Sequence, residues 1–379
     1  GDPATREVPV WLPPELQPGE RLPVCYVLAG FTGRGQSYLE THPWKRSVAS
    51  LYDEGCAKGE LPRVILVFPD CFTALGGSQY VNSSATGRYE DHLIQELVPW
   101  VDERYPTLPG RRAVCGKSSG GFGAMHLSMR HPGVFPAAGS ISGDCGFDFV
   151  FGAELLAAAR GLLARDQTPA EFLEAFRADP DLSGDAHAVL NSLAMAACYS
   201  PAPETELGFE LPVDLTTGER VDEVWQRWLQ FDPLHAVDSY ADGWRSLEHL
   251  HLECGTSDEF HLQFGLRRLV RRLEELVHSH PEGRALPILT SMERTRKAQM
   301  AASATKATYA ARCDKREQKQ FEELTATKDS ELATLKATLE KKKETLGEDT
   351  KTMTDSEVER DETQAQLKAD EKFFEETKS

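Results

Sequence analysis

The sequence lacks several features that would assign the chain to a well-defined functional class. Basic residues are scarce, with 42 Lys and Arg against 60 Asp and Glu and a formal net charge of −18, which argues against a nucleic-acid binder because phosphate contacts need clustered Lys and Arg. No apolar run approaches the ~18–20 residues of a membrane-spanning helix, so we expect no membrane partner. The opening GDPATREVPV is not a signal stretch, and we expect a cytoplasmic protein, as a processed form or a fragment.

Paired cysteines are also missing. The eight Cys residues include no C-x-x-C pair and no dense framework. Cys25, Cys115 and Cys254 lie in apolar, strand-like runs. This pattern favours buried thiols in a reducing compartment over disulfides or metal ligation, so we predict no metal site.

Proline and glycine disappear towards the C-terminus, which marks a domain boundary. All 22 Pro lie at or before Pro287, and 28 of the 29 Gly precede residue 292. Residues 292–379 carry 20 acidic and 18 basic side chains in 88 positions. We predict a first domain over residues 1–280, a linker over 281–291 and a long, charged α-helical tail beyond it.

Large apolar side chains in this tail follow a seven-residue grid, which is typical of a coiled coil. Arg360 interrupts the grid, and the other core positions after Leu335 are largely polar, so the apolar seam is thin. The tail therefore self-associates, remains a solvated and partly disordered charged helix, or is a mis-joined segment of a predicted gene. The grid consists of Leu332, Leu339, Leu346, Met353, Leu367 and Phe374.

The first domain alternates between strand-like and helix-like segments. Residues 22–31 and 62–70 are apolar runs that end in Gly, Pro or Asp, as buried parallel strands do. Residues 88–104 have helical spacing, and 111–116 form another short apolar run. This alternation predicts an α/β fold with right-handed crossovers. Helix-like stretches across about 145–245 interrupt the pattern and predict a cap inserted over the sheet.

A candidate nucleophile lies in the stretch GKSSGGFGAMHLSMRHP. Residues 116–120 match G-x-S-x-G, between a buried strand and a helix rich in small residues, which is the setting of a nucleophile elbow. Such a tight turn needs small neighbours, because larger side chains two positions away would collide. The turn would aim Ser118 at the helix N-terminus, where backbone N–H groups favour a developing oxyanion. The alternative is a glycine-rich turn without a chemical role.

This stretch, together with VLAGFTGRG, ILVFPDCFTALGGSQYVNSSATGRYEDHLIQELVPWVDERY and LECGTSDEF, resembles the putative-esterase branch of the α/β-hydrolase superfamily. Relatives in that branch include S-formylglutathione hydrolases and feruloyl esterases. The resemblance covers most of residues 1–275 and implies an α/β-hydrolase sheet with a cap. It also implies hydrolysis of a small-molecule carboxylic ester through an acyl-enzyme, with no cofactor. Transfer to an alcohol other than water would make the chain an acyltransferase.

The resemblance assigns roles to individual residues. Ser118 would be the nucleophile, and Asp258 in GTSDEF would be the acid of the triad. The oxyanion hole would use the backbone N–H of Ser119 and that of Phe31 or Thr32. The alternative for Asp258 is an N-cap of the helix that follows it.

Other positions are candidates for substrate contacts. Gln79, Asn82 and Tyr89 follow the second strand at the predicted catalytic edge, and we expect them to contact substrate. Trp225 and Trp228 lie on one face of a helix in the cap. They either belong to the core or line an acyl pocket.

The histidine of the triad is missing from its usual place. The chain order in this fold is Ser, acid, His, and no His follows His280. His261 lies three residues after the acid and is one substitute. We expect His126 to be packed in the core. His249 and His251 imitate a metal site, but their alternation is typical of a half-exposed strand face.

Two functions remain open at this point. The first is a serine esterase. Its activity would be impaired if no other base replaces the missing His, because loss of one triad member costs several orders of magnitude in rate. The second is a catalytically inactive hydrolase-fold scaffold, whose helical tail mediates oligomerisation or partner binding.

Overall fold

The fold of the first unit is built around one seven-stranded sheet. The computed structural model describes residues 5–40, 46–256, 258–278, 288–290 and 364. The sheet order is β1-β3-β2-β8-β9-β10-β11; β1 is antiparallel to β3, and the other neighbouring pairs are parallel. Its strands are β1 (Val10–Trp11), β2 (Leu22–Leu28), β3 (Ile65–Val67), β8 (Thr107–Lys117), β9 (Ala137–Ile141), β10 (His249–Glu253) and β11 (Ile288–Thr290).

Two short hairpins and a set of helices surround this sheet. The hairpins pair β4 (Phe72–Thr73) with β5 (Gly76–Gly77) and β6 (Asn82–Ser83) with β7 (Gly87–Arg88). The helices are the 3₁₀ turn η1 (Gly35–Tyr38), α1 (Val48–Ala57), α2 (Tyr89–Asp91), the π-helical η2 (His92–Leu97), α3 (Val98–Arg104), α4 (Ser119–Arg130), α5 (Phe147–Val150), α6 (Gly152–Arg165), α7 (Pro169–Ala178), α8 (Ala186–Tyr199), α9 (Asp222–Leu229), α10 (Ala241–Arg245) and α11 (Leu262–His278).

The central strands agree with the α/β-hydrolase fold expected from the sequence. Alternate residues of β2, from Leu22 to Leu28, are buried, as are all three residues of β3. Parallel strands have to be joined by crossover segments, and α4 supplies one between β8 and β9. The helix expected over residues 88–104 is present, but its middle is π-helical, which the spacing of apolar residues did not indicate.

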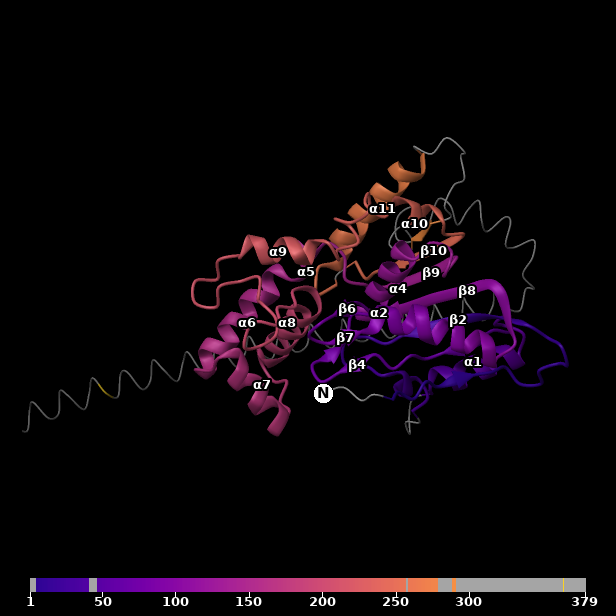
Figure 1. Cartoon of the computed structure of the whole chain (residues 1–379), viewed down its shortest axis with the longest axis horizontal. Helices are drawn as coiled ribbons and strands as arrows, with labels where there is room; N and C mark the ends of the chain where they lie inside the picture. Colours follow the sequence, from indigo (N-terminus) through magenta and orange to yellow (C-terminus); the bar gives the residue numbers. More distant parts are fainter. Residues whose placement is uncertain (1–4, 41–45, 257, 279–287, 291–363, 365–379) are drawn as a thin grey trace, which may run out of the picture. The chain divides into compact units, whose positions relative to one another are not determined.

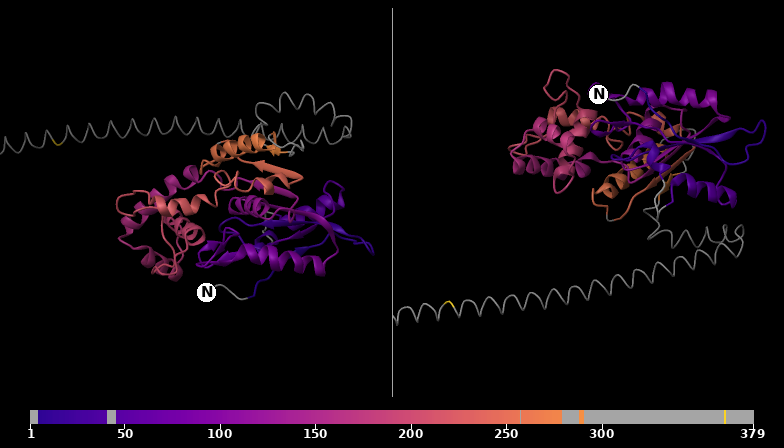
Figure 2. Two further views of the ribbon diagram at one scale, coloured as in Figure 1. Left: turned by 45° about the horizontal axis from the view of Figure 1, so that its top comes forward. Right: turned by 90° about the horizontal axis from the view of Figure 1, so that it is seen from below.

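The insertion predicted over about 145–245 is helical. Helices α6, α7, α8 and α9 gather at one end of the sheet, as Figures 1 and 2 show. Trp225 and Trp228 of α9 are only 2% and 0% exposed, and the indole N–H of Trp228 donates to Ser200 Oγ at 2.8 Å. Both indoles therefore belong to the core, which was one of the two alternatives.

The end of the first unit differs in one respect from the expected boundary. The chain divides into one compact unit up to Thr295 and another from Arg296. Strand β11 pairs in parallel with β10, matching Leu250 with Ile288. Three residues of the range predicted as a linker, Ile288–Thr290, thus belong to the sheet. The coiled-coil prediction for 292–379 lies outside the described residues, apart from a helical position at 364.

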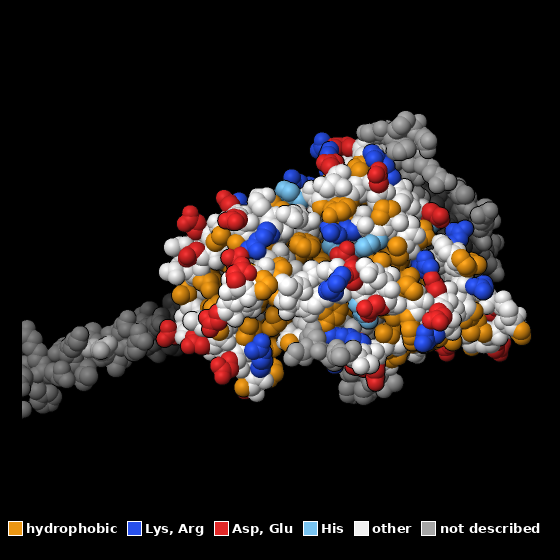
Figure 3. All heavy atoms as spheres, viewed as in Figure 1, with side chains coloured by type: hydrophobic (Ala, Val, Ile, Leu, Met, Phe, Trp, Pro, Cys, Tyr) orange, Lys and Arg blue, Asp and Glu red, His pale blue; other side chains and the backbone are white. Residues whose placement is uncertain are grey.

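The surface and the thiols add three observations. Acidic and basic side chains are intermingled on the face drawn in Figure 3. The seven cysteines in the described ranges are all free, and the sulfur atoms of Cys25 and Cys115 lie 3.6 Å apart on neighbouring strands. Within those same ranges, no helix is both long and apolar enough to cross a bilayer.

Candidate active site

Ser118 occupies a strained turn between β8 and α4. Its backbone has φ 56° and ψ −126°, a combination that a residue with a side chain rarely adopts. The turn is held in place because the Ser118 N–H donates to Ile141 O at 2.9 Å, while its carbonyl accepts from the Phe122 N–H at 2.9 Å. Strain of this kind costs on the order of 1–3 kcal/mol and is concentrated at functional sites. The elbow expected from G-x-S-x-G is therefore present.

The glycines on either side of Ser118 are required by close backbone contacts. A Cβ atom on Gly116 would lie 2.4 Å from the carbonyl carbon of Gly120. A Cβ on Gly120 would lie 2.2 Å from the carbonyl oxygen of Leu28, at the end of β2. Both distances are far below van der Waals contact. The predicted collision thus occurs, and it involves the neighbouring strand as well as the turn itself.

Two backbone N–H groups near Ser118 are open to an oxyanion. The loop after β2 lies against the elbow, since a Cβ on Gly30 would be 3.7 Å from Ser118 Cβ. Phe31 follows in this loop, and its carbonyl is fixed by the Gly77 N–H at 2.7 Å. Among the described residues, neither the Phe31 N–H nor the Ser119 N–H has a backbone acceptor. Preorganised donors of this kind stabilise developing negative charge.

Asp258 lies after β10, at the same edge of the sheet. It is half-buried, and its Oδ1 accepts from the Phe260 N–H at 3.0 Å. Helix α11 begins at Leu262, and the Asp258 carbonyl accepts from the His261 N–H at 3.2 Å, so Asp258 belongs to a turn before the helix and does not cap the helix itself. Its role as the triad acid stays a prediction.

A pair of buried carboxyl groups lies at this edge and was not anticipated. Burial raises the pKa of Asp144 to about 7, and the nearby charges of Glu154 and Asp258 add to this shift. Burial likewise raises the pKa of Glu154, on α6, to about 7. Both groups are therefore partly protonated at neutral pH and can donate as well as accept hydrogen bonds. The only sequence signal was the position of Asp144 just after β9, at the carboxyl end of a strand.

Gln79 is the predicted substrate-contact residue that the structure brings to these carboxyls. Its side chain is fully buried, and its hydrogen bond to Asp144 lowers the pKa of that carboxyl against the stronger effect of burial. Its Nε2 also lies 2.7 Å from the sulfur of Met195, on α8. Gln79 Oε1 and Glu154 Oε2 have no hydrogen-bond partner among the described residues. Polar side-chain atoms without hydrogen-bond partners among the described residues therefore lie where the cap contacts the edge of the sheet.

Asn82 and Tyr89 have structural partners instead. Asn82 is exposed, and its Oδ1 accepts from the Asp91 N–H at 3.1 Å. The hydroxyl of the buried Tyr89 accepts from Arg6, whose guanidinium carbon lies 5.2 Å from the centre of the Tyr89 ring. These contacts tie the N-terminal segment and the β6–β7 hairpin together, and nothing in them brings either side chain to Ser118.

His187 is a second residue that sequence analysis missed. It projects from the cap helix α8, and its ring lies edge-on to the Phe31 ring with the centroids 6.2 Å apart. Its Nδ1 is 4.0 Å from Glu154 Oε1, and the side chain is 42% exposed. The chain order Ser118, Glu154, His187 is the Ser, acid, His order of the fold. No local pattern marked His187, because the contact depends on how the cap folds over the sheet.

His126 and His261 differ sharply in their surroundings. His126 is completely buried, its ring stacks on Phe122, and its Nε2 lies 3.0 Å from Glu90 Oε2. It is packed in the core, as expected. His261 is exposed, with φ 61°, and its ring centroid lies 6.3 Å from that of Phe264.

The metal-like pattern on β10 is a strand face. His249, His251 and Glu253 alternate on the more exposed side of the strand, and His251 Nε2 contacts Glu253 Oε2 at 3.2 Å. In the part of the chain that the structure describes, no three His, Cys, Asp or Glu side chains gather closely enough to hold a metal ion.

The elbow, the open N–H groups and the acid at one sheet edge agree with a comparison against known families. A family model described as "Putative esterase" matches residues 3–279, which is most of the chain. The chain belongs to the putative esterase family. This assignment confirms the family resemblance seen in the sequence, and the match covers the cap and the sheet as far as β10.

Individual relatives of this chain are more distant. The chain is 24% identical over 144 residues to S-formylglutathione hydrolase of Mus musculus, an alignment that covers 36% of this chain and 51% of the relative. It is 36% identical over 92 residues to an esterase of Mycobacterium tuberculosis, covering 24% of this chain and 20% of the relative. The matched part thus spans about half the length of the mouse relative and less of the mycobacterial one.

Solved structures overlap with this chain at low similarity. A ferulic acid esterase overlaps 75% of this chain and 82% of its own, with 18% identity and a TM-score of 0.44. An S-formylglutathione hydrolase from Agrobacterium tumefaciens covers 75% and 81%, with 15% identity and a TM-score of 0.40. The description of the fold therefore rests on the sheet order and the elbow of this chain itself.

Proposed function

We propose that the chain is a serine hydrolase that cleaves a small-molecule carboxylic ester through an acyl-enzyme on Ser118. The strained backbone of Ser118, enclosed by Gly116, Gly120 and the loop at Gly30, is the observation that carries this proposal. A structural turn has no need of such strain, whereas a nucleophile has to be lifted out of the backbone to reach a carbonyl.

The reaction uses the groups at the sheet edge in a fixed order. Ser118 Oγ attacks the ester carbonyl and loses its proton to a base, and the carbonyl oxygen becomes an oxyanion. The N–H groups of Ser119 and Phe31 bind that oxyanion, a contribution worth about 10²–10³ in rate for a single donor. The alcohol then leaves with a proton, and water releases the acid from Ser118 by the same steps.

The base in this proposal is His187. Its Nδ1 faces Glu154, which leaves Nε2 directed away from that carboxylate, and its ring borders Phe31 in the oxyanion loop. The contact between Nδ1 and Oε1, at 4.0 Å, is longer than a hydrogen bond. On closer approach, the ionised form of Glu154 would orient the ring and stabilise its charged form, as the acid does in other triads. This role requires His187 Nε2 to approach Ser118 Oγ in the substrate complex, where catalytic hydrogen bonds often become shorter than in the free protein.

The buried carboxyls near the base contribute to substrate choice. Asp144 and Glu154 lie at the edge of the sheet beneath the cap, with Gln79 Oε1 unsatisfied beside them. These groups favour an ester whose acyl or alcohol part carries hydrogen-bond donors, because a purely apolar group would leave them buried without partners. Water is the proposed acceptor of the acyl group.

Hydrolysis of p-nitrophenyl esters by the full chain tests this function. We expect release of p-nitrophenol from short-chain esters, with a preference for acyl groups that carry a hydroxyl or amine, and loss of turnover in Ser118→Ala. Turnover that persists in that variant would contradict the proposal. The rival function, an inactive scaffold acting through the tail, has no support in the comparisons.

A further inference from the structure

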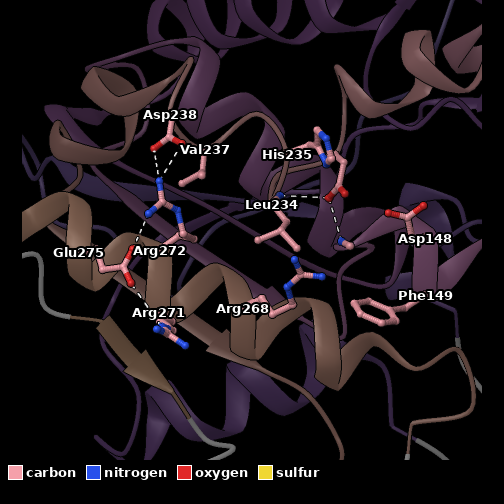
Figure 4. A pocket seen from close by; sticks show the side chains of 12 residues that line it. Asp148, Phe149, Leu234, His235, Val237, Asp238, Arg268, Arg271, Arg272 and Glu275 are labelled. Atoms are coloured by element: carbon pink, nitrogen blue, oxygen red, sulfur yellow. Dashed lines mark hydrogen bonds and ion pairs between the residues drawn. The ribbon is translucent and has the colours of Figure 1, made fainter. Parts of the chain in front are cut away.

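A second pocket lies apart from Ser118, between the cap and the last helix. Its volume is about 520 Å³, within the range of small-molecule sites. Figure 4 shows it where α5, the segment 232–238 and α11 meet. The lining includes neither Ser118 nor Phe31 nor Asp258, so the pocket is separate from the groups used in the proposed reaction.

The floor of this pocket is a rigid, internally satisfied structure. Asp232 is 1% exposed, and its carboxylate accepts from the backbone N–H groups of Gly146, Phe147 and Leu234 at 2.8, 2.9 and 3.0 Å. These bonds stabilise the buried carboxylate and fix the start of α5 against the segment that follows α9. The shape of the pocket is therefore formed without a ligand.

Two of the three arginines in the pocket are already paired. Arg272 binds both carboxylate oxygens of Asp238, at 2.9 and 2.8 Å. Arg271 lies 3.3 Å from Glu275, which also contacts Arg272. Figure 4 shows these pairs along one side of the pocket. Their charges are compensated, so they define the wall and do not attract an anion.

Arg268 is different. Its guanidinium points into the pocket in Figure 4, and its central carbon lies 5.7 Å from the centre of the Phe149 ring. No carboxylate of the described residues forms an ion pair with it, although the chain carries 60 acidic residues. The aromatic face holds the guanidinium in place by a cation–π contact and leaves its hydrogen-bond donors free.

The remaining side chains at the rim restrict the kind of anion that fits. Phe149, Leu234 and Val237 form an apolar wall beside Arg268. Asp148 stands at the rim, and its own partner, Arg220, is 3.5 Å away. The apolar wall favours an organic anion over an inorganic one, because only an organic anion has a nonpolar part to bury against it.

We propose that this pocket binds a small organic monocarboxylate, with the carboxylate on Arg268 and the apolar part against Phe149 and Leu234. The planar guanidinium fork matches a carboxylate through two parallel hydrogen bonds. Because the pocket joins α5, the segment after α9 and α11, a bound carboxylate ties the last helix to the cap. The inference does not depend on ester hydrolysis and is tested without it.

Titration of the full chain with sodium benzoate, followed by calorimetry and by saturation-transfer NMR, tests the site. We expect a dissociation constant of roughly millimolar, because one charged fork and a small apolar group supply the affinity. Benzoate should raise the melting temperature, since it binds the folded chain. Inorganic phosphate should bind at least about tenfold more weakly than benzoate. Equal binding of phosphate, or no binding of benzoate, would overturn the proposal.

Variants distinguish binding at Arg268 from a general attraction of anions to the positive charges of α11. Arg268→Gln should weaken benzoate binding about tenfold, whereas Arg267→Gln, at the exposed neighbouring position outside the pocket, should leave it within about twofold. Asp148→Asn should tighten binding by about twofold, because it removes a charge from the rim. Equal affinity in Arg268→Gln and Arg267→Gln would place benzoate elsewhere. If Arg268→Gln fails to fold, Arg268→Lys serves instead, because it retains the charge but loses the planar guanidinium. We expect it to bind benzoate several-fold more weakly than the unaltered chain. Full affinity in this variant would contradict the assignment.

Discussion

The backbone of Gly120 lies directly against the end of β2, where a methyl group added to Gly120 would come 2.2 Å from the carbonyl oxygen of Leu28. This contact locks the start of α4 onto the strand that precedes the oxyanion loop. The nucleophile turn and the loop that holds Phe31 are therefore one rigid unit, and a change at Gly120 has to disturb both.

Gly120→Ala should consequently destabilise the fold and disable the elbow. Overpacking of this kind costs about 1–3 kcal/mol, and the carbonyl of Leu28 cannot move without bending β2. Urea unfolding should show the loss of stability, and labelling of Ser118 by a fluorophosphonate should become slower. Gly152→Ala is the matched control, since nothing lies within 4 Å of a Cβ at that position. A stable, rapidly labelled Gly120→Ala chain would show that the close contact does not exist.

Asp144→Asn should change how the stability of the fold depends on pH. The pKa of Asp144 is raised from 3.8 to about 7 in the folded chain, so the folded state holds this proton more tightly than the unfolded state. Its contribution is fully present below about pH 3.8 and is lost as the pH rises towards 7. The variant, which cannot ionise, should match the unaltered chain near pH 4 and exceed its stability by on the order of 1–3 kcal/mol near pH 8.

Urea midpoints at several pH values check this prediction. The exposed Asp179 provides the control, because Asp179→Asn should leave the pH profile unchanged. If the stability of Asp144→Asn depended on pH in the same way as that of the unaltered chain, the pKa of Asp144 would not be raised. Its placement in buried, acidic surroundings would then be wrong.

His187→Gln should slow the labelling of Ser118 by at least about tenfold, because the serine would lose the group that accepts its proton. His261→Gln is the comparison and should label within about twofold of the unaltered chain. If His261→Gln slowed labelling more than His187→Gln did, His261 would be the base and the assignment to His187 would be wrong.

Truncation should reveal where the folded unit ends. A chain of residues 1–295 should fold, since Thr295 closes the first compact unit. A chain ending at residue 281 lacks β11 and exposes the edge of β10, an unpaired strand edge that promotes aggregation. We expect the longer product to elute as a discrete species on gel filtration and the shorter one to be less stable or to aggregate. Identical behaviour of both products would mean that β11 contributes nothing to the sheet.

The sequence predicted those parts of the site that depend on neighbouring residues. Gly116, Ser118 and Gly120 lie within five positions, and the geometry of one turn dictates their identities. Asp258 was named because it follows a recognisable strand, and its role as the acid stays a prediction. These features follow from local sterics and from the rule that ligands meet the carboxyl ends of parallel strands.

The parts that the sequence could not predict come from long-range packing. Asp144, Glu154 and His187 converge from a strand end and two cap helices, and no local spacing relates them. Asn82 and Tyr89 were named from their place in the chain, and the sequence did not show their contacts with Asp91 and Arg6; their contact with substrate stays a prediction. The pocket around Arg268 likewise depends on the folding of α11 against the cap.

The most direct test of the central claim is fluorophosphonate labelling of the full chain beside Ser118→Ala. The probe reacts with a serine that its surroundings have made nucleophilic. We predict one modified residue, identified as Ser118 by mass spectrometry of the digested chain, and no labelling of the variant. An unlabelled chain, with the reaction proceeding normally on a known serine hydrolase in parallel, would contradict the assignment of Ser118 as an activated nucleophile.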